Sequence, residues 1–532
     1  MTTCGEFIIR LLEAYGVEMI FGIPGVHTVE LYRGLSDSPI RHVTPRHEQG
    51  AGFMADGYAR VTGQPGVCFI ITGPGITNIL TAMGQAYADS IPMLVISSVN
   101  RTEHLGMGDG RLHELPSQRN MVAGVAAFSQ TILHAEQLPE VIARAFALFG
   151  SARPRPVHIE IPLDVIATPV SPTLLATART LPSRPSPALH AVARAAALLA
   201  GAEAPVIVLG GGAVGAAAEA MTLAERLDAP VIHTVNAKGI LPPGHPLRAG
   251  ENMALPPIRK LLAEADIVLA VGTEFGETEM YPDSQPIEIN GQLIRIDIDP
   301  EQLMRGPTSR LPIVADANLA LAELNQQLAE HRATTTSGAT RAAVTYEAVK
   351  DCWWPAVAIH QRIAEVILDC LPDVILVGDS AEPVYALNQS YQAPRPRSFF
   401  NSSTGYGTLG YGLPAGIGAK LAAPDRPVVV LAGDGGVQFS LPELAAAVEA
   451  EAPVILFLWN NHGYGEIKTY MQDRQITPIG VDIFTPDFQL IAKGFGCAAA
   501  KPATLHQLAR ELKEAAKRKV PTLIEMRPGT VM

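Results

Sequence analysis

The stretch that decides the fold runs from Val428 to Asn461 and reads VVVLAGDGGVQFSLPELAAAVEAEAPVILFLWNN. Two apolar runs, Val428–Leu431 and Val454–Trp459, flank a segment rich in Ala and Glu with helix-like spacing. A strand, a helix and a strand in this order favour a parallel sheet covered by helices, in which consecutive strands lie close together. The Gly-rich turn and the Asn-Asn pair are therefore expected at the same edge of one sheet.

Polar residues follow both strands of this stretch. Asp434 lies in the Gly-rich turn GDGG, and Asn461 follows the next strand 27 positions later (461 minus 434). Backbone N–H groups of such a turn can bind phosphate, and carboxylate, carboxamide and carbonyl oxygens suit octahedral Mg²⁺. The alternative is two ordinary strand-to-helix turns, since GDG by itself is common. The pair at this spacing favours a site for Mg²⁺ and a diphosphate.

The same alternation of strands and helices recurs along the rest of the chain. Pro- and Ser-rich residues after Ile166 and the TTTSGAT segment near residue 335 indicate two linkers. We therefore predict an α/β protein of three consecutive domains, each a mostly parallel sheet covered by helices, at residues 1–167, 188–328 and 344–532. The segments PGVCFIITGPGITN and RPVVVLAGDGGVQFS also repeat one pattern, which indicates either structural equivalence of the first and third domains or only the shared pattern of parallel strands.

Composition excludes several classes of protein. The 532 residues carry a net charge of -12, which argues against a basic surface for nucleic acid. The five cysteines are scattered and form no C-x-x-C pair, so neither a disulfide framework nor a thiolate zinc site is indicated. The sequence shows no signal core and no apolar run of the ~18 residues that a membrane span needs. A cytoplasmic protein without a membrane or nucleic-acid partner is expected.

With GDG, a spacer of this length and NN, the chain resembles the thiamine-diphosphate enzymes of the acetolactate synthase and pyruvate decarboxylase family. The resemblance covers nearly the whole chain and implies thiamine diphosphate and Mg²⁺ as cofactors. It implies that Mg²⁺ is bound by the side chains of Asp434 and Asn461 and the carbonyl of Gly463. It further places Gly433, Gly435 and Gly436 against the diphosphate.

A second segment, RHEQGAGFMADGYAR, contains Glu48 in a stretch of small residues that permit close approach of a backbone or a ring. Taken alone, Glu48 is a solvated residue or a partner of Arg46. The resemblance instead implies that Glu48 activates the cofactor by bonding N1′ of the aminopyrimidine, which favours the tautomer whose 4′-nitrogen removes the proton from C2.

The resemblance implies further cofactor contacts. Leu409, in TGYGTLGYGLPAGIGAK, matches the residue that holds the cofactor bent, although taken alone it is a core leucine. The Gly407 carbonyl would accept from the 4′-amino group, and Asn78 belongs to a turn on the pyrimidine side. Gly25 and Ser380 complete the predicted cofactor contacts. Family members form this site between subunits, so we expect a homodimer at least, or a homotetramer as in many relatives.

Two departures from acetolactate synthases bear on the substrate. His113 replaces a glutamine in the loop that reaches the reaction centre, and histidine can move protons near neutral pH, although a structural histidine is the alternative. Glu466 and Tyr470 replace an apolar residue and a tryptophan. A carboxylate in the substrate pocket needs a partner such as a cationic substrate tail, unless Lys468 or an arginine pairs with Glu466. Further acids expected around this pocket are Asp109, Glu114 and Glu382.

The middle domain departs from the flavin-binding members. Glu274 in VGTEFGE stands where those enzymes have an arginine that meets the flavin phosphates, which argues against FAD. The segment GGGAVG at 210–215 lacks the ordered G-x-G-x-x-G fingerprint of a dinucleotide site, so a structural turn is preferred.

These features predict a thiamine-diphosphate-dependent, non-oxidative decarboxylase with Glu48, His113 and Glu466 as its catalytic residues. The expected substrate is a 2-oxo acid with a basic tail, of the kind of 5-guanidino-2-oxopentanoate, which would give 4-guanidinobutanal and CO₂. One alternative is a carboligase of the acetolactate synthase type that joins two 2-oxo acids. Another is a non-catalytic regulatory homologue, against which the intact Glu48, Asp434 and Asn461 argue.

Overall fold

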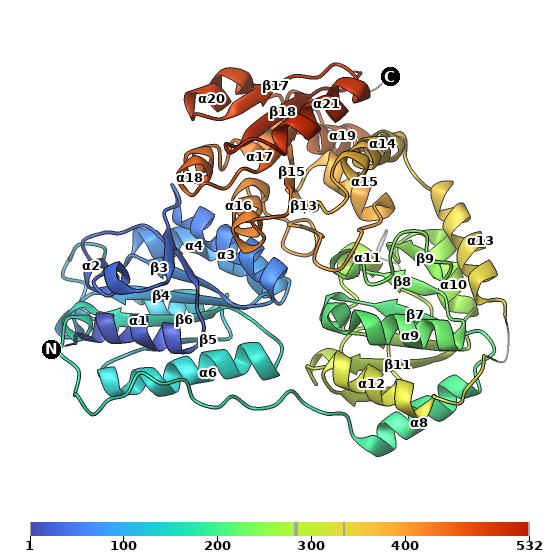
Figure 1. Cartoon of the computed structure of the whole chain (residues 1–532), viewed down its shortest axis with the longest axis horizontal. Coiled ribbons are helices and arrows are strands. Elements are labelled where there is room, and N and C mark those ends of the chain that lie inside the picture. The colour runs from blue at the N-terminus through green and yellow to red at the C-terminus, as the bar shows by residue number, and fades with distance from the viewer. Residues whose placement is uncertain (1, 281–285, 334–335, 530–532) are drawn as a thin grey trace. The chain divides into compact units, whose positions relative to one another are not determined.

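The computed structural model describes residues 2–280, 286–333 and 336–529, which form three six-stranded sheets with covering helices (Figure 1). The strands pair in parallel within each sheet. The predicted α/β fold is therefore confirmed. By its internal contacts the chain divides into two compact units, Met1–Ser183 with Tyr406–Thr530 and Arg184–Gly405.

The first sheet has the order β2-β1-β3-β4-β6-β5. Its strands are β1 (Met19–Gly22), β2 (Arg41–Val43), β3 (Gly66–Ile70), β4 (Met93–Val99), β5 (Phe128–Thr131) and β6 (Val157–Pro162). The helices of this part are α1 (Cys4–Ala14), α2 (Val29–Tyr32), α3 (Glu48–Thr62), α4 (Pro74–Ala88), α5 (Gln118–Ala123), α6 (Leu138–Ser151) and α7 (Leu163–Ile166).

The second sheet has the order β12-β11-β10-β7-β8-β9, which is the strand order of a Rossmann fold. Its strands are β7 (Val206–Leu209), β8 (Val231–His233), β9 (Arg248–Glu251), β10 (Ile267–Val271), β11 (Gln292–Asp297) and β12 (Leu311–Val314). The helices are α8 (Leu189–Ala200), α9 (Ala217–Leu227), α10 (Pro256–Glu264), α11 (Glu277–Met280), α12 (Ala317–Gln327) and α13 (Gly338–Lys350).

The third sheet has the order β14-β13-β15-β16-β18-β17. Its strands are β13 (Ile375–Gly378), β14 (Phe399–Asn401), β15 (Val428–Gly433), β16 (Ile455–Trp459), β17 (Ala498–Ala500) and β18 (Thr522–Met526). The helices are α14 (Pro355–Cys370), α15 (Glu382–Ser390), α16 (Gly412–Ala422), α17 (Asp434–Val437), α18 (Glu443–Glu449), α19 (Gly465–Asp473), α20 (Phe488–Gly494) and α21 (Leu505–Ala515).

The central strands are buried along their whole length because helices cover both faces of a parallel sheet. Every residue of β3, β4 and β16 is buried, including Ser97 and Ser98. The first and third sheets also share one order, in which β3 and β15 hold equivalent places. The repeated sequence pattern that contains these two strands therefore reflects structural equivalence.

Helices α3 and α16, far apart in the sequence, pack with their backbones in contact. A Cβ atom on Gly57 would lie 2.0 Å from the Ala415 carbonyl oxygen, and one on Gly418 would lie 1.9 Å from that of Met54. Only glycine fits at such a distance. Because Glu48 is the first residue of α3, this packing fixes the helix that carries the predicted activating carboxyl.

A buried charge network also holds α3. Arg60 donates to Asp56 and to Asp89, at 2.6 Å each, and the Tyr411 hydroxyl donates to Asp56 at 2.5 Å. Burial raises the pKa of Asp56, whereas the charge of Arg60 lowers it. Asp56 thus ties α3 to Tyr411, the residue before α16, and Arg60 ties α3 to Asp89 at the end of α4.

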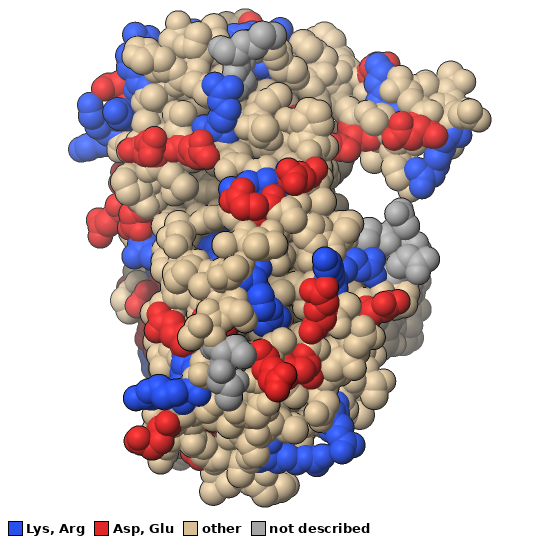
Figure 2. All heavy atoms as spheres, turned by 90° about the vertical axis from the view of Figure 1, so that its right-hand side faces the viewer, with Lys and Arg blue, Asp and Glu red and all other residues tan. Residues whose placement is uncertain are grey.

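The surface agrees with the acidic composition. On the face drawn in Figure 2, acidic and basic side chains of the described residues are interspersed, and basic side chains form no continuous area. Among the described helices, none is both long and apolar enough to cross a membrane.

Candidate functional site

Glu48 and Asn78 come together at the carboxyl ends of the first sheet's strands. Glu48 begins α3, and the Asn78 side chain on α4 donates from Nδ2 to Glu48 Oε2 at 2.9 Å. The other oxygen, Oε1, lies 3.3 Å from the position that a Cβ on Gly75 would take. The predicted cofactor contact Asn78 therefore binds the predicted activating carboxyl directly.

His113 reaches the same turn from the loop between β4 and α5. Its Nδ1 lies 3.0 Å from the Thr72 carbonyl oxygen, which can only accept, so Nδ1 carries the proton and Nε2 is left for other partners. Its backbone has φ = 62°, in the left-handed region that few residues other than glycine adopt. Such strain persists where the surroundings hold the residue in place.

A second histidine, His27, lies beside His113. The two ring centroids are 4.9 Å apart, and burial together with the charge of His113 lowers the pKa of His27. The Nδ1 atom of His27 is buried and has no hydrogen-bond partner among the described residues. The local sequence FGIPGVHTVELY does not identify His27 as a site residue, because only the fold brings His27 close to His113.

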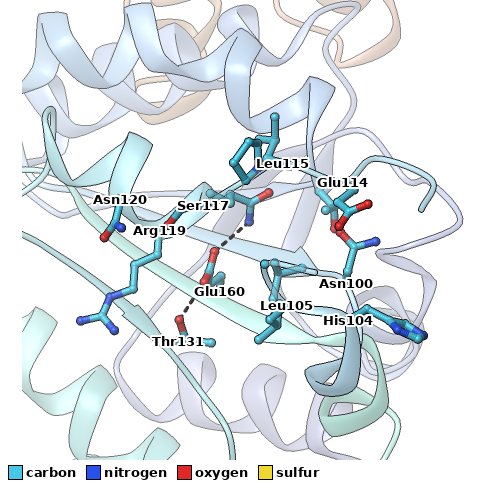
Figure 3. A pocket seen from close by; sticks show the side chains of 15 residues that line it. Asn100, His104, Leu105, Glu114, Leu115, Ser117, Arg119, Asn120, Thr131 and Glu160 are labelled. Carbon is cyan, nitrogen blue, oxygen red and sulfur yellow. Dashed lines mark hydrogen bonds between the residues drawn. The ribbon is translucent and has the colours of Figure 1, made fainter. Parts of the chain in front are cut away.

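A cavity of about 310 Å³ lies next to the His113 loop and is drawn in Figure 3. Thr72 and Glu114 both line it, so it adjoins His113, although its lining includes neither Glu48 nor Asp434. Glu160 lies deep in the cavity and accepts from Thr131 and Gln118, at 2.7 and 3.0 Å. Burial raises the pKa of Glu160. Its carboxyl is thus held by neutral donors.

The Asp434 turn brings the predicted metal ligands together. Asp434 is fully buried, and its carboxylate accepts from the backbone N–H groups of Asn461 and Gly463 at 3.2 and 3.0 Å and from the Thr485 hydroxyl at 3.3 Å. Strands β15 and β16 pair directly, with Gly433 opposite Trp459. This register places the two polar turns side by side.

Three oxygens of this turn fit a cation. The Asn461 side-chain oxygen faces acceptors only, 3.0 Å from the Gly463 carbonyl oxygen and 3.0 Å from Asp434 Oδ1. Neighbouring ligands of an octahedral Mg²⁺, each at about 2.1 Å, lie about 3 Å apart. With the amide rotated, its nitrogen donates to the Gly463 carbonyl and to Asp434 Oδ1, which is the favourable orientation without a cation, and with the oxygen inward the three oxygens could bind one. The predicted ligand set Asp434, Asn461 and Gly463 therefore fits Mg²⁺.

This set contains a single carboxylate. In the part of the chain that the structure describes, no three His, Cys, Asp or Glu side chains gather as a metal site. A cation at Asp434 would therefore depend on amide, carbonyl and phosphate oxygens, as Mg²⁺ bound to a diphosphate does. Gly435 packs closely against Tyr464, because a Cβ there would lie 2.6 Å from that ring.

The remaining predicted cofactor residues occupy turns. Gly433 ends β15, Gly436 is buried in α17, and the backbone N–H of Gly25 donates to the Thr28 hydroxyl at 2.9 Å. Gly407 has φ = 75° in the segment whose Tyr406 ring lies against Gly84 of α4, and Leu409 is half-buried. Ser380 belongs to the other compact unit, where its hydroxyl bonds that of Ser402 at 3.0 Å.

The residues predicted for the substrate tail lie on α19 and in the His113 loop. Glu466 is exposed in the first turn of α19, and Lys468 pairs with Asp482 at 2.7 Å. The Glu114 carboxylate accepts from the backbone N–H groups of Gly108 and Arg111, at 2.8 Å each, and so shapes the loop.

The other two predicted acids have partners of their own. Asp109 lies 3.9 Å from Arg111, and Glu382 bonds His360 at 2.9 Å in the other compact unit. Lys468, Glu114, Asp109 and Glu382 thus have partners within the chain, and the role of Glu466 stays a prediction.

Glu443 is a further residue at the site that the sequence does not single out. It is buried in α18, and its carboxylate accepts from the backbone just before Glu48. In the sequence it belongs to an ordinary helical stretch, and its partners lie 397 and 396 positions away.

Comparison with known proteins places this geometry in context. Three profiles match the chain: the N-terminal TPP binding domain of thiamine pyrophosphate enzymes at residues 2–122, their central domain at 192–324 and their C-terminal TPP binding domain at 379–526. A protein of Pseudomonas aeruginosa named as a probable 2-ketoarginine decarboxylase, AruI, is 48% identical over 527 residues, which span 99% of this chain and 94% of that protein.

Acetolactate synthases are more distant. The isozyme 1 large subunit of Escherichia coli is 33% identical over 548 residues, covering 99% of this chain and 94% of its own length. A probable large subunit of Methanocaldococcus jannaschii is 31% identical, covering 98% and 91% respectively.

Proposed function

The chain belongs to the thiamine pyrophosphate enzyme family, and we propose that it is a non-oxidative decarboxylase of a 2-oxo acid with a basic tail. The substrate proposed is 5-guanidino-2-oxopentanoate, converted to 4-guanidinobutanal and CO₂. The observation that carries this proposal is the 48% identity, along nearly the whole chain, with a protein named for 2-ketoarginine decarboxylation. The position of His113 at the turn next to Glu48 and Asn78 supports it.

The cofactor residues have separate roles in this proposal. Asp434, Asn461 and the Gly463 carbonyl would hold Mg²⁺, and Gly433, Gly435 and Gly436 would lie against the diphosphate. When bound, thiamine diphosphate supplies a nucleophilic carbon for the 2-oxo group and accepts the electron pair that CO₂ leaves behind. Gly25, Asn78, Ser380 and the Gly407 carbonyl would contact the cofactor, and Leu409 would support its bent form.

Glu48 and His113 would supply the acid and base groups of the reaction. The Glu48 carboxyl, held by Asn78, would share its proton with N1′ of the aminopyrimidine. His113, whose Nδ1–H bonds Thr72, would present Nε2 to the substrate; once Nε2 has taken up a proton from solvent, the imidazolium would deliver it to complete the aldehyde and return to the neutral Nδ1–H form. A protonating residue at this point favours release of an aldehyde over joining of a second 2-oxo acid.

Glu466 would determine substrate choice. It lies in the first turn of α19, directly after the Asp434–Asn461–Gly463 turns, and Lys468 is engaged with Asp482. A guanidinium on the substrate could form charge-assisted hydrogen bonds with this carboxylate, which a pyruvate methyl group cannot do.

Assembly and organisation belong to the same proposal. Each thiamine diphosphate would lie between two subunits, so Glu48 and Asp434 of the same chain would contact two different molecules of the cofactor. A homodimer would therefore be the smallest active form, and a homotetramer would be compatible with it. Three domains at 1–167, 188–328 and 344–532, a cytoplasmic location and a place in arginine catabolism stay predictions.

The test is a panel of 2-oxo acids assayed with thiamine diphosphate and Mg²⁺, measuring CO₂ and aldehyde for each. We expect 5-guanidino-2-oxopentanoate to give both in equal amounts, with the highest kcat/KM of the panel. Glu466→Gln should lower kcat/KM for this substrate and not for 2-oxobutyrate. Acetolactate from pyruvate as the main product would instead establish the carboligase, and equal losses on both substrates would remove the role of Glu466.

A further inference from the structure

The carboxylate of Glu443 caps the segment from which Glu48 projects. Its Oε1 and Oε2 accept from the backbone N–H of Arg46 at 3.0 and 3.1 Å, and Oε1 also accepts from that of His47 at 3.1 Å. Amides at the start of a helix have no partner within the helix, and a negative charge there also complements the helix dipole. Glu443 thus holds the backbone directly before Glu48, the first residue of α3.

The contact leaves little room for adjustment. Glu443 is 1% exposed, and a Cβ atom on Gly50 would lie 2.2 Å from its Oε1. The Glu443 backbone is fixed in turn, since its N–H bonds the Ser440 carbonyl at 2.9 Å. A shift of this carboxylate would therefore move the two amides that it holds, and Glu48 with them.

The charged and titratable groups around Glu443 are Arg46, His47, Glu48 and Glu449. The Arg46 side chain points to the exposed Glu449 on the same helix α18, at 2.5 Å, and to the Thr44 carbonyl. His47 caps α3 by accepting from the Gln49 N–H. Burial raises the pKa of Glu443 to about 7, Arg46 and the two backbone amides lower it, and the charge of Glu48 raises it. The cap therefore changes its charge near neutral pH.

We propose that Glu443 is a positioning residue for Glu48: by binding the amides of Arg46 and His47 it fixes the start of α3 and so the carboxyl that activates the cofactor. The inference rests on the proposed role of Glu48. It assigns no contact between Glu443 and the substrate. The functional role is to keep Glu48 in register with Asn78 during the reaction.

The main variant is Glu443→Gln, which has nearly the same shape but no charge. Its oxygen could still accept from both amides, as Oε1 does, but its NH₂ group would face the Arg46 N–H in place of the acceptor Oε2. Glu449→Gln is the matched control, because Glu449 lies on the same helix and its exposed carboxylate pairs with the Arg46 side chain rather than with the backbone before Glu48. Gly50→Ala is a second variant, which displaces the Glu443 carboxylate without removing its charge.

Three measurements are made on the full-length protein. The first is hydrogen–deuterium exchange at C2 of thiamine diphosphate bound to the holoenzyme, which reports cofactor activation without any substrate. The second is the thermal unfolding midpoint of the cofactor-free protein. The third is the pH profile of kcat.

We expect Glu443→Gln and Gly50→Ala to slow C2 exchange at least tenfold while unfolding cooperatively near the wild-type midpoint. Glu443→Gln should also lose an ionisation near pH 7 from the kcat profile, and Glu449→Gln should match the wild type. Wild-type C2 exchange in Glu443→Gln would overturn the inference, as would a loss explained entirely by a lower unfolding midpoint. Rapid C2 exchange in a wild type that releases no CO₂ would refute the proposed function and leave this inference standing.

Discussion

The Asn78 amide donates to Glu48 Oε2 at 2.9 Å, so the carboxyl predicted to activate the cofactor is oriented by a residue 30 positions further along the chain. Since α3 and α4 belong to one compact unit, the pair exists within a single chain. Asn78, which the sequence alone places only in a turn on the pyrimidine side, is therefore the direct hydrogen-bond partner of Glu48.

Replacing Asn78 by alanine should lower kcat by about 10–100-fold, because a hydrogen bond to a charged group contributes about 1.5–3 kcal/mol. Steady-state CO₂ release measures the effect. Thr77→Ala is the control, since the Thr77 hydroxyl on the same helix donates to the Pro74 carbonyl and not to Glu48. Equal rates for the two variants would show that Asn78 does not support Glu48.

The unfolding free energy of the cofactor-free protein should depend on pH through Glu443. Its pKa is raised from 4.5 to about 7 in the folded state, so between these values the native protein holds a proton that the unfolded chain has lost. The contribution of Glu443 to the free energy of unfolding is therefore fully present below about pH 4.5. It is lost as the pH rises to 7, a change of about 3 kcal/mol. Urea unfolding of the wild type and Glu443→Gln at a series of pH values checks this, and parallel curves would contradict it.

Mg²⁺ and Asp434 should control cofactor binding. Removal of Mg²⁺ with a chelator, or Asp434→Asn, should weaken binding of thiamine diphosphate by at least about 100-fold, since in the proposed site Asp434 would hold the cation that neutralises the diphosphate. Fluorescence titration of the cofactor measures the affinity. Asp487→Asn, which keeps an N-cap residue on α20, should bind normally. Unchanged affinity after metal removal would refute the site.

His113→Phe should slow aldehyde release about 100-fold while CO₂ release in the first turnover persists, because the variant lacks the proton donor. Rapid-quench measurement of both products in one turnover separates the steps. His104→Gln, in the same loop, serves as the control. If CO₂ and aldehyde decline together, His113 acts before the loss of CO₂.

Arg60→Met should destabilise the protein by about 3–5 kcal/mol, since it leaves Asp56 and Asp89 buried without their counter-charge. Arg33→Ala, which removes an exposed ion pair with Glu30, should cost less than about 1 kcal/mol. Chemical denaturation of the cofactor-free protein compares them. Similar losses would mean that the Arg60 network contributes little.

Much of the fold could be predicted from periodicity. The apolar runs at Ile267–Val271 and Met93–Ser97 correspond to β10 and β4, because strands buried on both faces need continuous apolar sequence. Short edge strands such as β2 (Arg41–Val43) and β17 (Ala498–Ala500) were not predicted. They are partly exposed, and their pairing depends on the neighbouring strand rather than on their own residues.

By itself, the sequence determined the α/β class and which polar residues end the strands of the Asp434–Asn461 stretch, because strand periodicity and turn composition are local properties. Only the tertiary structure decided that the Asn461 amide lies 3.0 Å from Asp434 and from Gly463, that His27 lies against His113, and that Glu443 caps the start of α3. These contacts join segments up to hundreds of positions apart, and burial in the folded chain, which no local pattern encodes, gives Glu443 and His27 their altered proton affinities.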